Sequence, residues 1–360
     1  MISIVLGTRP EIIKMAPVIR ACQKAGADYS ILHTGQHYSH EMDRVFFRDL
    51  ELPEPGHNLD VGSGSHAEQT GKIMAGVEAI WLKETPDIVL VQGDTNTVLA
   101  GALAAAKLHV PVGHVEAGLR SFDRSMPEEI NRVVADHISD LLFAPTELSR
   151  KNLLQEGIDP KKIHVTGNTV VDAVFQNRSI AQKRSTVLKE MDLSPGKYFL
   201  ATAHRAENVD VHERLAGIMT ALSSLSKKYS VPVIFPMHPR TQKMLRDFSL
   251  PSDGVTITQP IGYLDFLELE AHASLVLTDS GGLQEEACIL GVPCVTLREN
   301  TERPETVDVG ANVLAGTDPD QIVTAADRMI SQRKTWKNPY GDGSAGEKIV
   351  RICSSTQPKG

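Results

Sequence analysis

Short apolar segments alternate with amphipathic segments along the chain, and this alternation occurs twice. In the first half, apolar runs fall at residues 2–6, 29–33, 87–91, 111–115, 141–144 and 163–165, with helical patterns between most of them. The same plan restarts at residue 198 and continues to residue 297. Strands that are apolar at almost every position are typical of parallel sheets covered on both faces. The pattern therefore predicts an α/β protein with two doubly wound parallel sheets.

The boundary between the two halves is marked by residues 169–193, which are typical of a long helix and a crossing segment. Ser194, Pro195 and Gly196 then interrupt the pattern. We therefore expect an N-terminal domain of residues 1–168 and a C-terminal domain of residues 169–344. A last helix within residues 345–360 is expected to pack back onto the N-terminal domain. Ligands of doubly wound sheets bind beyond the carboxyl ends of the strands, so two such domains face to face predict a cleft.

The composition argues against several classes of protein. The 360 residues carry a net charge of −8, which disfavours nucleic acid or an anionic membrane as the main partner. No apolar run approaches the roughly 20 residues that span a bilayer, and the first residues predict a strand instead of a signal peptide. The four cysteines lack both CxxC and metal-ligand spacing, which predicts reduced thiols in the cytoplasm and no zinc site.

A glycine pair links the apolar run at residues 275–277 to the helical pattern at residues 283–290. The linking residues are Thr278, Asp279, Ser280, Gly281 and Gly282. Glycines at a helix N-terminus let a ligand approach unbonded N–H groups, and the helix dipole favours negative charge there. The turn therefore predicts a phosphate or diphosphate site, although an ordinary strand-to-helix turn also favours Ser and Gly. The sequence fingerprints of a classical NAD site and of a P-loop are both absent.

Polar residues collect where the predicted strands end. They are Arg9, Glu11, Gln36, His37, Asp94, Glu116, His204, Arg205, His238, Asp279 and Ser280. Each alone fits a helix cap or a turn. Together, their high content of arginine, histidine and acid favours a site along one edge of each sheet.

The charges of these and neighbouring residues indicate the chemistry of that site. Cations suit a diphosphate. The cations expected near the glycine turn are Arg9, Lys14, His204, Arg205 and Arg303. The carboxylates expected from the other domain are Asp94, Glu116 and Glu128. Because neighbouring carboxyl groups can have their pKa values pushed apart, one can act as base and another as acid. We therefore expect carbon–hydrogen or glycosidic chemistry on a nucleotide-linked substrate, with no metal required.

Seven segments together resemble the non-hydrolysing UDP-N-acetylglucosamine 2-epimerases, in particular their archaeal branch. The segments are GTRPE at 7–11, QGDT at 92–95, HVEAGLRS at 114–121, PEEINR at 127–132, HR at 204–205, TDSGGLQEE at 278–286 and TERPE at 301–305. Each is short, but the set runs from the first predicted strand into the last third of the chain. The resemblance implies two Rossmann-like domains of the glycosyltransferase-B type, a homodimer, and closure of the cleft around the substrate.

The resemblance also implies the reaction, which is the reversible conversion of UDP-GlcNAc to UDP-ManNAc without a cofactor. A base removes the proton on carbon 2 while UDP leaves, and UDP re-adds to the 2-acetamidoglucal after the proton returns to the opposite face. The implied acid/base residues are Asp94, Glu116 and Glu128, with His204 beside the diphosphate. The residues that fall where the family holds UDP or ribose are Arg9, Lys14, Phe266, Ser280, Gly281, Gly282, Glu286 and Arg303.

Three other hypotheses stay open at this point. Hydrolysing relatives release free ManNAc and UDP on the same fold, and retaining glycosyltransferases use similar glycine and basic contacts. A non-catalytic nucleotide-sugar-binding protein is the third hypothesis, but the intact carboxylates argue against it. Residues 38–43 differ from the bacterial pattern through which UDP-GlcNAc acts as an allosteric activator, so that regulation is not assigned. The sequence also does not assign each carboxylate to one face of the sugar.

Overall fold

The chain divides into two compact units. The computed structural model describes residues 1–36, 40–332 and 334–355. The first unit holds residues 1–176 together with the described residues from Tyr340 onward, and the second unit holds residues 177–339. The division falls inside helix α7 (Thr169–Arg184), whereas the sequence pattern predicts a boundary just before that helix, between residues 168 and 169.

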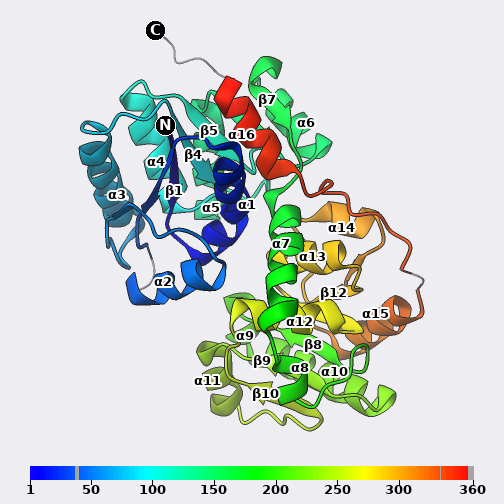
Figure 1. Ribbon diagram of the computed structural model, residues 1–360. Helices are drawn as coiled ribbons and strands as arrows, with labels where there is room; N and C mark the ends of the chain where they lie inside the picture. Colours follow the sequence, from blue (N-terminus) through cyan, green and yellow to red (C-terminus); the bar gives the residue numbers. More distant parts are fainter. Residues whose placement is uncertain (37–39, 333, 356–360) are drawn as a thin grey trace. The chain divides into compact units, whose positions relative to one another are not determined.

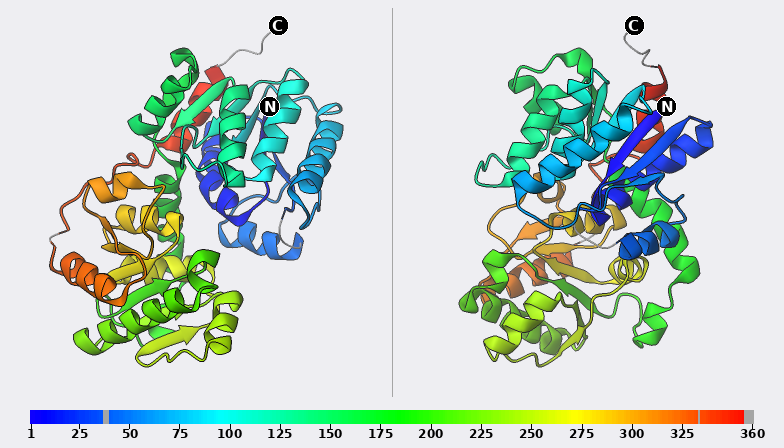
Figure 2. Two further views of the ribbon diagram at one scale, coloured as in Figure 1. Left: turned by 180° about the vertical axis from the view of Figure 1, so that it is seen from behind. Right: turned by 90° about the vertical axis from the view of Figure 1, so that its left-hand side faces the viewer.

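The first unit is built on a parallel sheet with the strand order β3-β2-β1-β4-β5-β6-β7 (Figure 1). Its strands are β1 (Ile2–Leu6), β2 (Tyr29–His33), β3 (His57–Asn58), β4 (Ile88–Gln92), β5 (Val112–Val115), β6 (Leu141–Ala144) and β7 (Ile163–Val165). Its helices are α1 (Arg9–Ala25), α2 (His40–Asp49), α3 (His66–Trp81), α4 (Asn96–Lys107), α5 (Pro127–Ile138), α6 (Glu147–Gln155), the 3-10 turn η1 (Pro160–Lys162), the first part of α7, and α16 (Ala345–Ser355). Helix α1 contacts α2 and α16, whereas α4 contacts α3 and α5. Two groups of helices thus cover the two faces of this sheet (Figure 2).

The second unit repeats this plan with the strand order β10-β9-β8-β11-β12-β13. Its strands are β8 (Phe199–Thr202), β9 (Val233–Pro236), β10 (Val255–Thr258), β11 (Leu275–Thr278), β12 (Cys294–Thr296) and β13 (Asn312–Leu314). Its helices are α8 (Val187–Glu190), α9 (Ala206–Val209), α10 (His212–Tyr229), α11 (Pro239–Asp247), α12 (Tyr263–His272), α13 (Gly281–Leu290), α14 (Pro304–Asp308) and α15 (Pro319–Ser331). The predicted fold class, two doubly wound parallel sheets in an α/β protein, is confirmed.

One strand was missed by the sequence pattern. The pattern predicts a loose segment at residues 52–65, but β3 lies there and pairs in parallel with β2, through Leu32 with His57 and His33 with Asn58. A two-residue edge strand is too short to show the periodicity that identifies longer strands. The first sheet therefore has seven strands within the described residues, one more than the pattern predicts.

Helix α1 illustrates how local sequence sets the ends of an element. Pro10 lies in its first turn, where a missing N–H is harmless, and Gly26 ends it in the left-handed conformation at φ 62°. The last helix, α16, packs against α1 in the first unit (Figure 1). Asp172 accepts hydrogen bonds from the N–H groups of Ala345 and Gly346 at 3.2 and 3.0 Å, which caps α16 from α7.

The strand order places a switch point in each sheet. In the first sheet, the chain leaves β1 for β2 on one side, and β4 later pairs on the other side of β1. In the second sheet, the chain leaves β8 for β9 on one side, and β11 later pairs on the other side of β8. The crevice beyond the carboxyl ends at such a point is where doubly wound sheets bind ligands. None of the described helices combines the length and apolar character needed to cross a membrane.

Candidate active site

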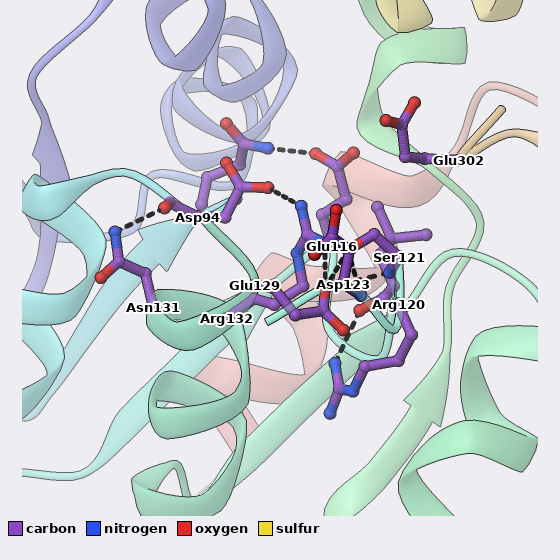
Figure 3. Close-up of polar contacts among 12 residues, drawn as sticks. Asp94, Glu116, Arg120, Ser121, Asp123, Glu129, Asn131, Arg132 and Glu302 are labelled. Atoms are coloured by element: carbon purple, nitrogen blue, oxygen red, sulfur yellow. Dashed lines mark hydrogen bonds and ion pairs between the residues drawn. The ribbon is translucent and has the colours of Figure 1, made fainter. Parts of the chain in front are cut away.

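The turns at the switch point of the first sheet carry Asp94, which follows β4 after Gly93. Its carboxylate pairs with Arg132 of α5, and its carbonyl oxygen accepts a hydrogen bond from Asn131 Nδ2 at 2.9 Å (Figure 3). The Asp94 side chain is 31% exposed, so the carboxylate is held by Arg132 and is still accessible to solvent. A guanidinium orients a carboxylate and compensates its charge. This arrangement suits a group that exchanges a proton with a bound molecule.

Glu116 follows β5 and faces two donors from neighbouring elements. Lys14 Nζ lies 2.8 and 2.7 Å from the two carboxylate oxygens, and Gln92 of β4 also donates to Glu116 Oε2. Glu116 has a φ of 72°, a strained conformation for a non-glycine residue. Hydrogen bonds from the N–H groups of Glu116 and Ala117 to the carbonyl oxygen of Phe143 hold the strained turn in place. Lys14 therefore forms an ion pair with Glu116, one of the acid/base candidates. The contact of Lys14 with UDP stays a prediction.

Two adjacent glutamates in the first turn of α5 have different surroundings. Glu128 is exposed, whereas Glu129 is buried. Glu129 accepts hydrogen bonds from Ser121 N and Oγ at 2.9 Å and from Phe122 N at 3.0 Å, and it pairs with Arg132. Burial acts to raise the pKa of Glu129, but these donors lower it below its ordinary value. Glu129 thus fixes a loop, and Glu128 is the carboxylate of the pair that a substrate can reach.

His204 lies at the switch point of the second sheet, after β8. Its Nδ1 is 2.9 Å from the carboxylate of Asp279, which follows β11 and is completely buried. The backbone N–H groups of His204 and Arg205 and the amide of Asn208 also donate to Asp279. Burial acts to raise the pKa of Asp279, but the His204 ring and these N–H groups lower it below its ordinary value. An ionised Asp279 holds the proton on Nδ1, which leaves Nε2 of a half-exposed ring for a ligand.

The glycine turn connects β11 to α13 through Ser280. Ser280 N donates to Thr278 Oγ1 at 2.9 Å, and α13 begins at Gly281. A Cβ atom added at Gly281 or Gly282 would meet no described atom closer than 3.7 Å, and neither glycine has a positive φ. Internal packing and backbone conformation therefore do not explain the pair. The open space at both glycines would allow a ligand to approach the helix N-terminus closely.

Arg303 and Glu286 lie on elements next to this turn. Arg303 Nε is 2.8 Å from the carboxylate of Glu285, which is completely buried on α13. Glu286 faces Glu270 of α12, and burial together with the Glu286 carboxyl raises the pKa of Glu270 well above its ordinary value. A protonated Glu270 can donate to Glu286 and so favours Glu286 as the ionised partner. These contacts orient a cation and a carboxylate that are suited to a phosphate and a ribose.

Arg9 and Phe266, which are also predicted to contact UDP, each have neighbours within their own unit. Arg9 lies at the start of α1, with its guanidinium 5.1 Å from the centre of the Phe46 ring. Phe266 of α12 is partly buried and packs against the core of the second unit. His37, which the strand-end pattern included, lies outside the described residues, as do residues 38 and 39 of the segment related to allosteric activation.

The predicted residues are divided between the two units. Arg9, Lys14, Asp94, Glu116 and Glu128 belong to the first unit, and His204, Phe266, Ser280, Gly281, Gly282, Glu286 and Arg303 belong to the second. Arg132, Gln92 and Glu285 are contacts of these residues that the sequence did not single out, although each lies in one of the seven segments. Their partners come from other elements of the chain, and short sequence segments do not show which elements meet.

The fold has a glycine turn at a helix N-terminus in one unit and carboxylates held by cations in the other, an arrangement that suits an enzyme of nucleotide-sugar chemistry. The family model described as UDP-N-acetylglucosamine 2-epimerase matches residues 20–354. The chain is 56% identical to the UDP-N-acetylglucosamine 2-epimerase of Methanocaldococcus jannaschii, and the match covers 98% of each chain. It is 42% identical to a UDP-2,3-diacetamido-2,3-dideoxy-D-glucuronate 2-epimerase of Pseudomonas aeruginosa, over 97% of this chain and 98% of that protein.

A solved structure supports the same family. The crystal structure of the Methanocaldococcus jannaschii UDP-GlcNAc 2-epimerase in complex with UDP-GlcNAc and UDP matches with a TM-score of 0.89 and 56% identity, covering 99% of both chains. The chain belongs to the UDP-N-acetylglucosamine 2-epimerase family and is an isomerase with its fold. The family predicted from the seven segments is confirmed, and the methanogen relative agrees with the archaeal branch.

Proposed function

We propose that the protein interconverts UDP-GlcNAc and UDP-ManNAc by eliminating UDP to form a 2-acetamidoglucal and then re-adding it. The observation that carries this proposal is the pair of anchored carboxylates, Asp94 and Glu116, which follow the neighbouring strands β4 and β5. Inversion at one carbon needs proton exchange on both faces of that carbon. Asp94, Glu116 and Glu128 are the acid/base residues in this proposal.

The second unit binds the UDP part of the substrate. The N-terminus of α13, with Ser280, Gly281 and Gly282, accepts the phosphates, since unbonded N–H groups and the helix dipole stabilise negative charge. His204 Nε2 and Arg303 stabilise the diphosphate as it leaves, because elimination next to a weakly acidic carbon needs a good leaving group. Glu286 holds the ribose hydroxyl groups as a hydrogen-bond acceptor.

The first unit carries out the bond-breaking steps. Asp94 is held by Arg132 and Glu116 by Lys14, so each carboxylate has a fixed direction and a nearby cation. The cations also compensate for negative charge when a proton moves between carbon and carboxylate. Arg9 and Lys14 are further substrate-binding residues in this proposal, as is Phe266 of the second unit.

Incubation of the pure protein with UDP-GlcNAc in deuterated water tests the reaction. UDP-ManNAc with deuterium at carbon 2 is the expected product, because the abstracted proton exchanges with solvent before it returns. Free ManNAc would instead indicate a hydrolase, and UDP binding without turnover would indicate a binding protein. The Pseudomonas relative makes a parallel incubation with a UDP-2,3-diacetamido sugar informative about substrate range.

Substitution of one carboxylate tests the division of labour. Asp94→Asn should lower kcat by about 10²-fold or more, since a general base has been removed. Its Kd for UDP, measured by calorimetry, should change less than about twofold, because Asp94 has no part in UDP binding here. Loss of UDP binding in this variant would contradict the separation of roles.

We also propose a homodimer that works in the cytoplasm. Phe122 and Ile130 are 76% and 46% exposed on or just before α5, and exposed apolar side chains of this size support a protein interface. All four cysteines are buried free thiols, which supports a reducing compartment. Light scattering on the eluted protein measures the number of subunits.

A further inference from the structure

Glu11 is a buried carboxyl group in the first turn of α1 that the proposed mechanism does not use. Its residue is 2% exposed, and its Oε2 accepts hydrogen bonds from Gly7 N at 2.5 Å and Thr8 N at 3.1 Å. A glutamate at this position of a helix commonly closes a capping box by accepting the N–H of the cap residue. Glu11 does this through one oxygen. Its second oxygen has a different partner.

That partner is Thr95, whose hydroxyl group donates to Glu11 Oε1. Thr95 is the residue immediately after Asp94 and the cap residue of α4. Glu11 therefore joins the turn after β1 to the turn after β4, across the switch point of the first sheet. A capping role alone would not require the second contact.

Helix α1 connects Glu11 to the other acid/base candidate as well. Lys14 lies three residues further along α1 and pairs with Glu116 at 2.7 Å. Residues three apart lie on the same face of a helix. One face of α1 thus contacts the Asp94 turn through Glu11 and the Glu116 carboxylate through Lys14, which sets the spacing of the two carboxylates.

The charge of Glu11 acts on the same turn. Burial raises the pKa of Glu11 to about 7, although hydrogen bonds from Thr95, Gly7 and Thr8 lower it, and the Asp94 carboxylate also raises it. An ionised Glu11 is also a stronger hydrogen-bond acceptor for the Thr95 hydroxyl group than the neutral acid would be. The other charged or titratable groups that face this turn are Arg132 of α5, which pairs with Asp94, and the Lys14–Glu116 pair. His114 of β5 also faces it, because its Nε2 lies 2.7 Å from the Gly93 carbonyl oxygen; burial lowers the pKa of His114, but Asp136 and Asp94 raise it above its ordinary value.

We propose that Glu11 is a positioning residue whose carboxylate holds the Asp94 turn through Thr95. The inference rests on the proposed role of Asp94 in epimerisation. Ionisation of Glu11 near neutral pH then strengthens the hydrogen bonds that hold this turn and so orients the Asp94 carboxylate more firmly. The rate of proton transfer at carbon 2 follows this change.

Glu11→Gln removes the charge and keeps the shape. The amide oxygen still accepts from Gly7 and Thr8, and the amide NH2 can donate to Thr95. The measured quantity is the ratio of wild-type to variant kcat from about pH 6 to about pH 8. Because ionisations shared by both proteins cancel, the ratio should change roughly threefold to tenfold with a midpoint near pH 7. A pH-independent ratio would overturn the proposal, whatever its size.

A matched control and a second variant support this measurement. Glu68→Gln changes the glutamate at the same position of α3, which is exposed and pairs with Lys72, so its ratio should stay near one. Thr95→Val leaves the charge but removes the hydroxyl donor to Glu11. Since that hydrogen bond lowers the pKa of Glu11, the midpoint should move to higher pH, and an unmoved midpoint would contradict the contact. Wild-type protein without epimerase activity would overturn the proposed function instead.

Discussion

Asp279 anchors the turn that presents His204, and Asp279→Asn tests this role. The carboxylate accepts hydrogen bonds from two backbone N–H groups and from Asn208, and it lies 2.9 Å from His204 Nδ1. Asparagine has nearly the same shape and keeps one acceptor oxygen. It has no charge, however, and it turns an NH2 group toward one of these donors. We expect a folded protein in which the His204 ring is misoriented.

The magnitude follows from the contacts that are weakened. Hydrogen bonds to a charged group contribute about 1.5–3 kcal/mol each, and neutral ones contribute about 1 kcal/mol. The His204 ring is 52% exposed, so solvent screens its ion pair and most of the loss comes from the buried backbone and amide contacts. The free energy of unfolding should fall by about 2–4 kcal/mol. Because an orienting carboxylate is lost, kcat should fall by about 10²-fold or more.

The stability difference also depends on pH in a defined direction. The pKa of Asp279 lies below the ordinary value of 3.8, so its ionised form is favoured in the folded state. The stabilisation is fully present above about pH 4 and is lost as the pH falls through the lower folded-state pKa. Urea unfolding of both proteins should therefore give a constant gap from about pH 8 to about pH 5 and a smaller gap below about pH 4.

The matched control is Asp327→Asn in the same unit. Asp327 pairs with Lys228 at the surface, so its substitution should change stability by less than about 1 kcal/mol and leave kcat unaltered. An Asp279→Asn protein with wild-type stability and turnover would refute the anchoring role. A protein that loses stability but retains kcat would show that the contact with His204 plays no part in the reaction.

Substitutions in the first unit give two further predictions, both measured by thermal unfolding and turnover. Glu128→Gln should leave the melting temperature unchanged, because the Glu128 side chain is exposed. It should lower kcat about 10²-fold, because an acid/base group is removed. Glu129→Gln should lower the free energy of unfolding by about 1–3 kcal/mol, because buried donors lose a charged acceptor; equal melting temperatures for the two variants would contradict this contrast. Gly118→Ala should destabilise by more than about 2 kcal/mol, since a Cβ atom would lie 2.4 Å from the Ser149 carbonyl oxygen. Gly157→Ala has a similar φ and an open space, so it should cost only about 1 kcal/mol, and an equal loss in both would exclude the clash as the cause.

The sequence by itself determined the elements and their chemistry. Buried strands such as β11 are apolar at successive positions, and the ends of α1 follow from Pro10 and Gly26, because these signals act over a few residues. The glycine pair at 281–282 also indicated an anion site from local sequence alone. The seven segments identified the family. A two-residue strand such as β3 gave no comparable signal.

Only the tertiary structure decided which of these polar residues act together. Lys14 meets Glu116 across 102 positions of sequence, and Thr95 meets Glu11 across 84. The order of strands in a parallel sheet brings such residues together, and local periodicity does not encode that order. The choice between Glu128 and Glu129 has the same origin, because both occupy the first turn of α5 and only packing buries one of them. Local sequence selects the residue types, and the long-range strand pairing selects their partners.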